Sequence, residues 1–95
     1  MEPGIQDIGI SDVVLSLAGR DQGQLFYCVG TDDQFVWLAD GKGRTLDKPK
    51  RKKRKHVQKV LRAETRVANK LRSSDKVLNS ELRRDLAYLS NNLGG

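Results

Sequence analysis

Short apolar runs separated by turn-forming residues fill the first part of the chain. The clearest runs are residues 12–18, 25–29 and 34–39, which are rich in β-branched, aliphatic or aromatic side chains. Such runs predict β-strands, and we expect two more strands near residues 44–46 and 54–58. Because strand patterns recur about every ten residues with no helical pattern between them, the sequence predicts a small antiparallel barrel rather than a parallel α/β sheet.

Glycines stand at the expected turns. Gly19 and Gly23 flank the turn after the first run, and Gly41 and Gly43 flank the turn after the third. Glycine adopts positive φ at little steric cost, as tight hairpins require. We therefore interpret all four glycines as residues that shape turns and let the backbone come close to a ligand.

Beyond residue 59 the apolar period changes from about two to about 3.6 residues. A narrow stripe predicts a first amphipathic helix: Val60, Ala63, Val67 and Leu71. After a break at residues 73–75, Asn79 is the expected N-cap of a second helix that ends near Asn91. The stripe of this second helix is a candidate for docking a protein: Leu78, Leu82, Leu86 and Leu89. Helices this short need a surface to pack against.

The composition indicates one small domain with extensions. Of the 95 residues, 37% are hydrophobic and 32% are charged, so we expect a modest core and no deep active site. No membrane helix or secretory leader is recognisable, and the single Cys28 fits a reducing, cytoplasmic setting. We expect a flexible N-terminal extension over residues 1–10, the barrel over 11–58 and a helical C-terminal tail over 59–95.

Charge is distributed unevenly along the chain. Residues 1–41 carry seven acids and one base, whereas residues 42–72 carry fourteen Lys or Arg and two acids. Residues 73–95 carry three of each sign, so the formal net charge of +6 comes from the middle segment. A contiguous positive segment attracts polyanions, which directs the search for a partner to this part of the chain.

Six consecutive cations, residues 50–55, lie within a basic segment at 48–56. Like charges repel one another, and nucleic-acid phosphates supply the counter-charge that such a run needs. The candidate RNA-binding residues are Arg20, Lys42, Arg44, Lys48, Lys50, Arg51, Lys52, Lys53, Arg54, Lys55 and His56. A basic row beyond them extends the same track: Lys59, Arg62, Arg66 and Lys70. A solvated charged loop and a nuclear-import signal are the alternatives. We expect such a segment to recognise RNA by shape more than by base sequence.

Aromatic side chains in the predicted strands could add base stacking. Phe35 and Trp37 point to one face of their strand, and in so small a barrel we expect that face to be core. Tyr27 is then the better candidate for an exposed ring.

Arrangements typical of catalysis are not found. Cys28 and His56 are the one candidate catalytic dyad, but Cys28 lies in mid-strand, where a thiol usually behaves as a small core residue. Asp32 and Asp33 read as turn residues rather than as a paired acid and base. We therefore expect no enzyme, no metal, no cofactor and no small-molecule substrate.

Parts of the chain resemble a known family. Residues 13–23, with the sequence VVLSLAGRDQG, resemble a KOW motif, in which a strand enters a glycine-containing turn. Residues 36–43 and 48–57 resemble bacterial KOW-domain proteins akin to the large-subunit ribosomal proteins of archaea and eukaryotes. The resemblance covers residues 11–58. It implies an SH3-like barrel that binds ribosomal RNA and has no enzymatic activity.

The chain departs from the family at two points. Gln24 stands where many KOW sequences carry a lysine, so Arg20 is the cation left at that turn, and the two helices lie outside the resemblance. The leading hypothesis is a cytoplasmic, non-enzymatic RNA-binding protein whose partners are ribosomal RNA and, as a further option, ribosomal proteins, with no membrane contact. The alternative is a protein-interaction adaptor of the transcription or translation machinery that uses the leucine stripe.

Overall fold

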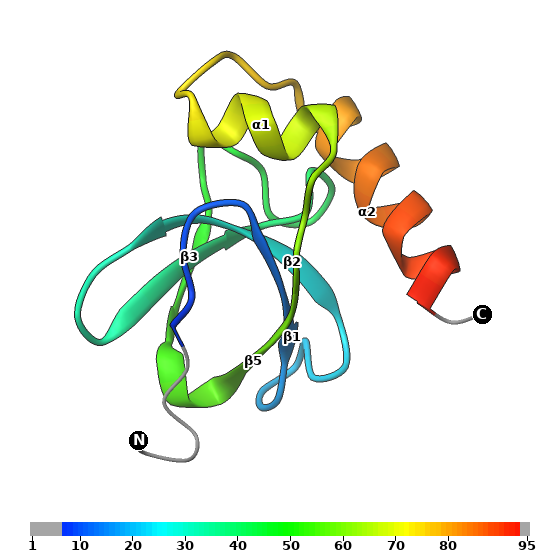
Figure 1. Ribbon diagram of the computed structural model, residues 1–95. Coiled ribbons are helices and arrows are strands. Elements are labelled where there is room, and N and C mark those ends of the chain that lie inside the picture. Colours follow the sequence, from blue (N-terminus) through cyan, green and yellow to red (C-terminus); the bar gives the residue numbers. More distant parts are fainter. Residues whose placement is uncertain (1–6, 94–95) are drawn as a thin grey trace.

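The chain folds into a five-stranded antiparallel sheet with two helices. A computed structural model describes residues 7–93 (Figure 1). Its elements are β1 Asp12–Ser16, β2 Leu25–Thr31, β3 Phe35–Ala39, β4 Lys50–Lys53, the 3₁₀ turn η1 Arg54–His56, β5 Val57–Arg62, α1 Arg66–Arg72 and α2 Asn79–Leu93. The predicted class, mainly β followed by helices, is confirmed.

The strand order requires the sheet to curl. The order is β4-β3-β2-β1-β5, so β4 and β5 are the two edges. Four interstrand steps of about 4.8 Å would separate these edges by about 19 Å in a flat sheet. The only link between them is η1, and a 3₁₀ turn of this length advances about 6–8 Å. The edges therefore approach each other at η1, although β4 and β5 do not pair within residues 7–93.

Two predicted elements are wrong. Residues 44–46 form no strand, because side chains satisfy the backbone of this connection: Asp40 Oδ1 accepts from the N–H groups of Lys42 and Arg44, each at 2.9 Å. The fourth strand lies instead in the basic run. The helix expected from residue 59 begins only at Arg66, because residues 57–62 pair with β1 as the strand β5.

The sheet has a separate core on each face. On the inner face, toward which the sheet curls, Val36 of β3 and Val57 of β5 belong to one buried cluster although two strands lie between them. The full inner cluster is Ile8, Val14, Phe26, Cys28, Val36, Leu38 and Val57. On the outer face the helices cover part of the sheet, in a cluster of Val13, Tyr27, Ala39, Ala63, Val67, Ala68, Leu82 and Leu86 (Figure 1).

The helices and the first described residues therefore belong to the same domain as the sheet. The predicted helical tail packs on the sheet, because Leu82 and Leu86 are only 0% and 7% exposed, and Leu89 packs against the same cluster. Of the predicted docking leucines only Leu78, 52% exposed, faces solvent. The predicted extension over residues 1–10 lies mostly outside the described residues, but within it Ile8 is 2% exposed and part of the inner core.

A buried hydrogen-bond network fixes the helices to the sheet. The Tyr27 hydroxyl on β2 donates to the carboxylate of Asp85 on α2, and Thr65 Oγ1 donates to the same carboxylate oxygen at 2.8 Å. Thr65 Oγ1 also accepts from the N–H of Ala68, which makes it the N-cap of α1. Burial and the Asp85 charge raise the pKa of Tyr27. Tyr27 is fully buried, so its predicted role as an exposed ring is wrong.

Gly41 allows the connection between β3 and β4 to touch the start of α2. Its φ is +80°, and a Cβ at this position would lie 2.2 Å from the carbonyl oxygen of Asn79. Asn79 was expected as an N-cap, but its side chain instead accepts from the N–H of Leu46 at 2.8 Å. Gly19 and Gly23 also have positive φ, whereas Gly43 does not, so Gly43 is not required by the turn.

We expect Gly41→Ala to lower the free energy of unfolding by about 3 kcal/mol. A positive φ costs a non-glycine residue about 1–2 kcal/mol, and the added methyl group would overlap backbone that has no room to move. Urea denaturation measures the effect. Gly43→Ala in the same connection is the matched control, because no atom lies within 4 Å of its Cβ position. Equal denaturation midpoints for the two variants would contradict the packing described.

Candidate nucleic-acid interface

The strand β4 divides the basic run between two faces. Successive side chains of a strand point to opposite sides. Lys50 and Lys52 are paired with Leu38 and Val36 and share their inner face, whereas Arg51 and Lys53 are paired with Trp37 and Phe35 on the outer face. Instead of a uniform basic arm, the segment is an edge strand with two chemically different sides.

The two inward lysines are neutralised by Asp21. Lys52 Nζ lies 2.5 Å from Asp21 Oδ1 and also donates to Ser16 Oγ and to the carbonyl of Ala18, each at 2.7 Å. Lys50 Nζ lies 2.7 Å from the second oxygen, Asp21 Oδ2. Burial alone would raise the pKa of Asp21, but these hydrogen bonds outweigh it and hold the pKa well below the usual range.

This cluster removes two residues from the predicted RNA-binding set. Lys52 is 8% exposed and its ammonium group is fully engaged by oxygen atoms of the protein. Lys50 is half-buried and is held by the same carboxylate. Both predictions are corrected, because a buried cation needs a fixed counter-charge and these lysines have one inside the protein.

Arg54 and His56 also have structural roles. Arg54 is half-buried, and its guanidinium donates to the carbonyls of Asp32 at 2.9 Å and Ile8 at 3.2 Å, which ties η1 to the first described residues. His56 is half-buried in η1, and its carbonyl accepts from the N–H of Leu17 at 2.9 Å. Lys55, between them, is exposed.

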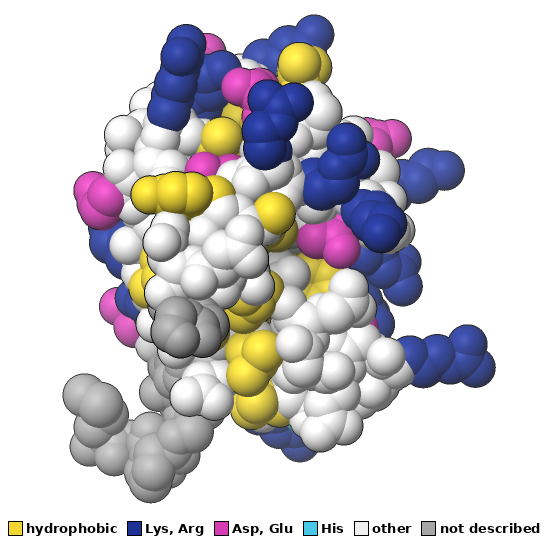
Figure 2. All heavy atoms as spheres, turned by 90° about the vertical axis from the view of Figure 1, so that its right-hand side faces the viewer, with side chains coloured by type: hydrophobic (Ala, Val, Ile, Leu, Met, Phe, Trp, Pro, Cys, Tyr) yellow, Lys and Arg dark blue, Asp and Glu magenta, His cyan; other side chains and the backbone are white. Residues whose placement is uncertain are grey.

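The remaining predicted cations all reach solvent. They are Arg20, Lys42, Arg44, Lys48, Arg51, Lys53 and Lys55, and we call them the exposed cations. None of them forms a salt bridge with any of residues 7–93. On the face that carries α2, Lys and Arg side chains project along the upper and right-hand margins of the molecule (Figure 2). The exposed cations are therefore available for an anionic partner.

Some of these cations surround a hollow beside β4. Arg20 comes from the β1–β2 loop and Arg44 from the β3–β4 connection, and both line a hollow of about 350 Å³ together with Lys50. Gln24 lines it as well. The acids at its wall are occupied, since Asp21 binds two lysines and Asp40 accepts backbone N–H groups. The hollow has the charge and size to admit a phosphate group.

The outer side of β4 carries a second arrangement, which we call the aromatic patch: Phe35, Trp37, Arg51 and Lys53. The register places Trp37 opposite Arg51 and Phe35 opposite Lys53. Both rings are half-buried. Val36, which lies between them in the strand, and Leu38, which follows Trp37, are fully buried. The prediction that Phe35 and Trp37 form the core is therefore wrong, because the aliphatic residues of this strand face the interior.

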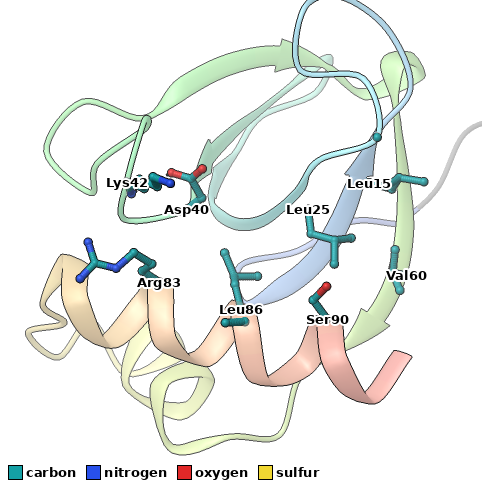
Figure 3. Close-up of a pocket in the computed structure, with 10 residues that line it drawn as sticks. Leu15, Leu25, Asp40, Lys42, Val60, Arg83, Leu86 and Ser90 are labelled. Atoms are coloured by element: carbon teal, nitrogen blue, oxygen red, sulfur yellow. Dashed lines mark hydrogen bonds between the residues drawn. The ribbon is translucent and has the colours of Figure 1, made fainter. Parts of the chain in front are cut away.

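A groove runs between α2 and the sheet. Leu25 on β2 and Leu86 on α2 point toward each other across it, and Arg83 lies at the end away from Val60 (Figure 3). Its volume is about 550 Å³, and its apolar lining is Leu15, Leu25, Val60, Leu86 and Ala87. The floor is continuous with the outer core. The apolar surface that the leucine stripe was expected to offer is thus reduced to this seam.

The described residues were predicted to hold neither a metal site nor a reactive cysteine, and the structure bears on both groups. Residues 7–93 contain no cluster of His, Cys, Asp or Glu able to hold a metal ion. Cys28 is fully buried, and burial raises the pKa of its thiol to about 11, so the nucleophilic thiolate is scarce near neutral pH. No helix in this part of the chain has the length and apolar character needed to cross a bilayer.

Comparison with models of known protein families and with curated proteins finds no match.

We expect Asp21→Asn to lower the free energy of unfolding by about 3 kcal/mol or more, because it leaves a buried lysine without its counter-charge. The stabilisation that the Asp21 carboxylate contributes also depends on pH. Since the pKa of Asp21 in the folded protein is below its ordinary value of 3.8, the stabilisation is complete above that pH and is lost as the pH falls through the folded pKa.

Thermal melts from neutral pH down to acid test both statements. Asp33→Asn, at an exposed position of the β2–β3 turn, is the matched control and should melt like the unmodified protein. If Asp21→Asn melted like this control and had the same acid dependence as the unmodified protein, the ion pair would not hold the loop on β4.

Proposed function

We propose that this protein is a non-enzymatic RNA-binding protein, ribosome-associated or ribosomal-protein-like, that contacts ribosomal RNA phosphates with its exposed cations. We further propose that its curled sheet is an SH3-like barrel of the KOW type. Cytoplasmic localisation follows from such a partner. Binding by these side chains requires neither a cofactor nor a chemical step.

The observation that carries the proposal is the selective pairing of charges. Two acids near β4 are engaged inside the protein, Asp21 by two lysines and Asp40 by backbone N–H groups. The exposed cations, in contrast, form no salt bridge with an acid among the described residues. Charge that a protein leaves unneutralised along one edge creates a field that favours a polyanion.

A structural explanation of the same cations exists, because charged residues on an edge strand prevent pairing with other sheets. Protection of β4 requires charge only on β4, however, and the exposed cations continue beyond it. Arg20 and Arg44 lie on two loops rather than on β4, and both line the hollow beside it. This continuation favours phosphate binding over edge protection.

The adaptor alternative has lost its main support. It relied on an exposed leucine stripe, and Leu82 and Leu86 are instead buried against the sheet. RNA binding therefore remains the function that the described surface supports best.

Removing three exposed cations with Arg51→Gln, Lys53→Gln and Lys55→Gln should weaken binding to a ribosomal RNA fragment and make it less salt-dependent. Each lost phosphate contact lowers the slope of log affinity against log salt by about 0.7–0.9, so the slope should fall by about two units. Titrations by fluorescence anisotropy between about 50 and 200 mM KCl measure both quantities.

The matched control removes the same charge elsewhere, with Lys76→Gln, Arg83→Gln and Arg84→Gln, which are exposed on or beside α2. It should keep most of the affinity and slope. Equal losses in both variants would reduce the interaction to net charge, and absence of RNA binding in the unmodified protein at low salt would refute the proposal. Double-stranded DNA serves as the comparison ligand, and RNA should be preferred.

A further inference from the structure

Part of the outer face of the sheet is left uncovered by the helices. The residues of β3 that share this face are Phe35, Trp37 and Ala39, because alternate residues of a strand point the same way. Ala39 is buried in the outer core beneath the helices, whereas Phe35 and Trp37 lie farther along the strand and remain half-buried. The aromatic patch is thus the uncovered continuation of a surface that is elsewhere packed.

The patch is held in place by its neighbours. Trp37 is paired with Gly30 of β2, and a Cβ on that glycine would lie 3.6 Å from Trp37 Cβ and 3.8 Å from Cε3, so the indole lies along bare backbone. On the other side, the Arg51 guanidinium lies 4.5 Å from the centre of the Phe35 ring. A cation over an aromatic face at this distance is attracted to the ring. Both rings therefore have fixed positions on a rigid sheet.

Rings and cations alternate across this small area. Trp37 lies opposite Arg51, and Phe35 lies opposite Lys53. Directly opposed residues of antiparallel strands have Cβ atoms about 5 Å apart. A ligand that contacts one ring is therefore within reach of a cation. A planar group joined to a phosphate fits this pattern, and a nucleotide with an unpaired base has that composition.

We propose that the aromatic patch binds an unpaired nucleotide of RNA, with the base stacked on Trp37 and its phosphates held by Arg51 and Lys53. This inference rests on the RNA-binding function proposed above and adds the kind of RNA. In a duplex the faces of the bases are stacked on one another and are not accessible, so the patch selects loops, bulges and single strands. Recognition by shape, expected from the basic segment, would instead favour the duplex.

Trp37 is the only tryptophan of the chain, which makes its fluorescence a direct reporter of the patch. Two RNA probes of equal length are compared, a single strand without self-complementarity and a blunt duplex of the same base composition. Stacking on the indole should quench the fluorescence with the single strand and leave it nearly unchanged with the duplex. This measurement uses the unmodified protein and does not depend on how a variant folds.

Substitution of the ring gives the second readout. Trp37→Ala should weaken binding of the single strand about tenfold or more, because stacking of one base contributes that much, and should change duplex binding less than about twofold. Its salt dependence should stay that of the unmodified protein, since no phosphate contact is lost. Trp37→Phe, which keeps an aromatic face, should retain most of the single-strand affinity. Circular dichroism and thermal melts establish that the variants are folded.

The outcomes separate this inference from the proposed function. If RNA binds with steep salt dependence but the single strand leaves Trp37 fluorescence unchanged, the inference is overturned while RNA binding stands, and a protein partner becomes the better candidate for the patch. Equal quenching by the duplex would also overturn it. If neither RNA binds at low salt, the proposed function itself fails, and the inference fails with it.

Discussion

One buried carboxylate organises the basic part of this protein. Asp21 accepts Lys52 at 2.5 Å and Lys50 at 2.7 Å, and these contacts let two lysines stand on the inner face of the sheet beside fully buried aliphatic side chains. Because side chains alternate along a strand, fixing this pair inward directs Arg51 and Lys53 outward. The same ion pairs attach the β1–β2 loop to the edge strand, so loop position and surface charge depend on one interaction.

The strands and their turns were largely predictable, because β-branched runs and glycine-containing turns are local signals. The role of the basic run could not be predicted from such signals. Its alternation could be seen in the sequence, but the acid that neutralises Lys52 lies 31 residues earlier in the chain, and no local pattern links the two. The high charge density alone therefore predicts an exposed arm. Residues 44–46 form no strand for a similar reason. The Asp40 carboxylate, rather than a partner strand, accepts hydrogen bonds from the backbone of this connection.

The second feature that the sequence could not predict is which face of an element packs against the rest of the protein. Residues 34–39 are apolar at both parities, so the sequence could not decide whether aromatic or aliphatic side chains would face the interior. The leucine stripe of α2 correctly indicated an amphipathic helix, yet a stripe does not reveal whether its partner is another protein or the same chain. Here Tyr27 and Asp85, 58 residues apart, join the helix to its own sheet. The sequence therefore indicates which residues pack against a partner. It does not indicate which partner they pack against.

The placement of Arg51 and Lys53 on a hydrogen-bonded strand has a consequence for discrimination among ligands. A cationic segment without fixed structure adapts to almost any spacing of negative charge, and it loses conformational entropy each time it binds. On β4 most of that entropy is lost once, when the protein folds. The distance between the two charges is then set by the backbone, so a polyanion whose own charges cannot adopt that spacing would compete poorly, however many charges it carries.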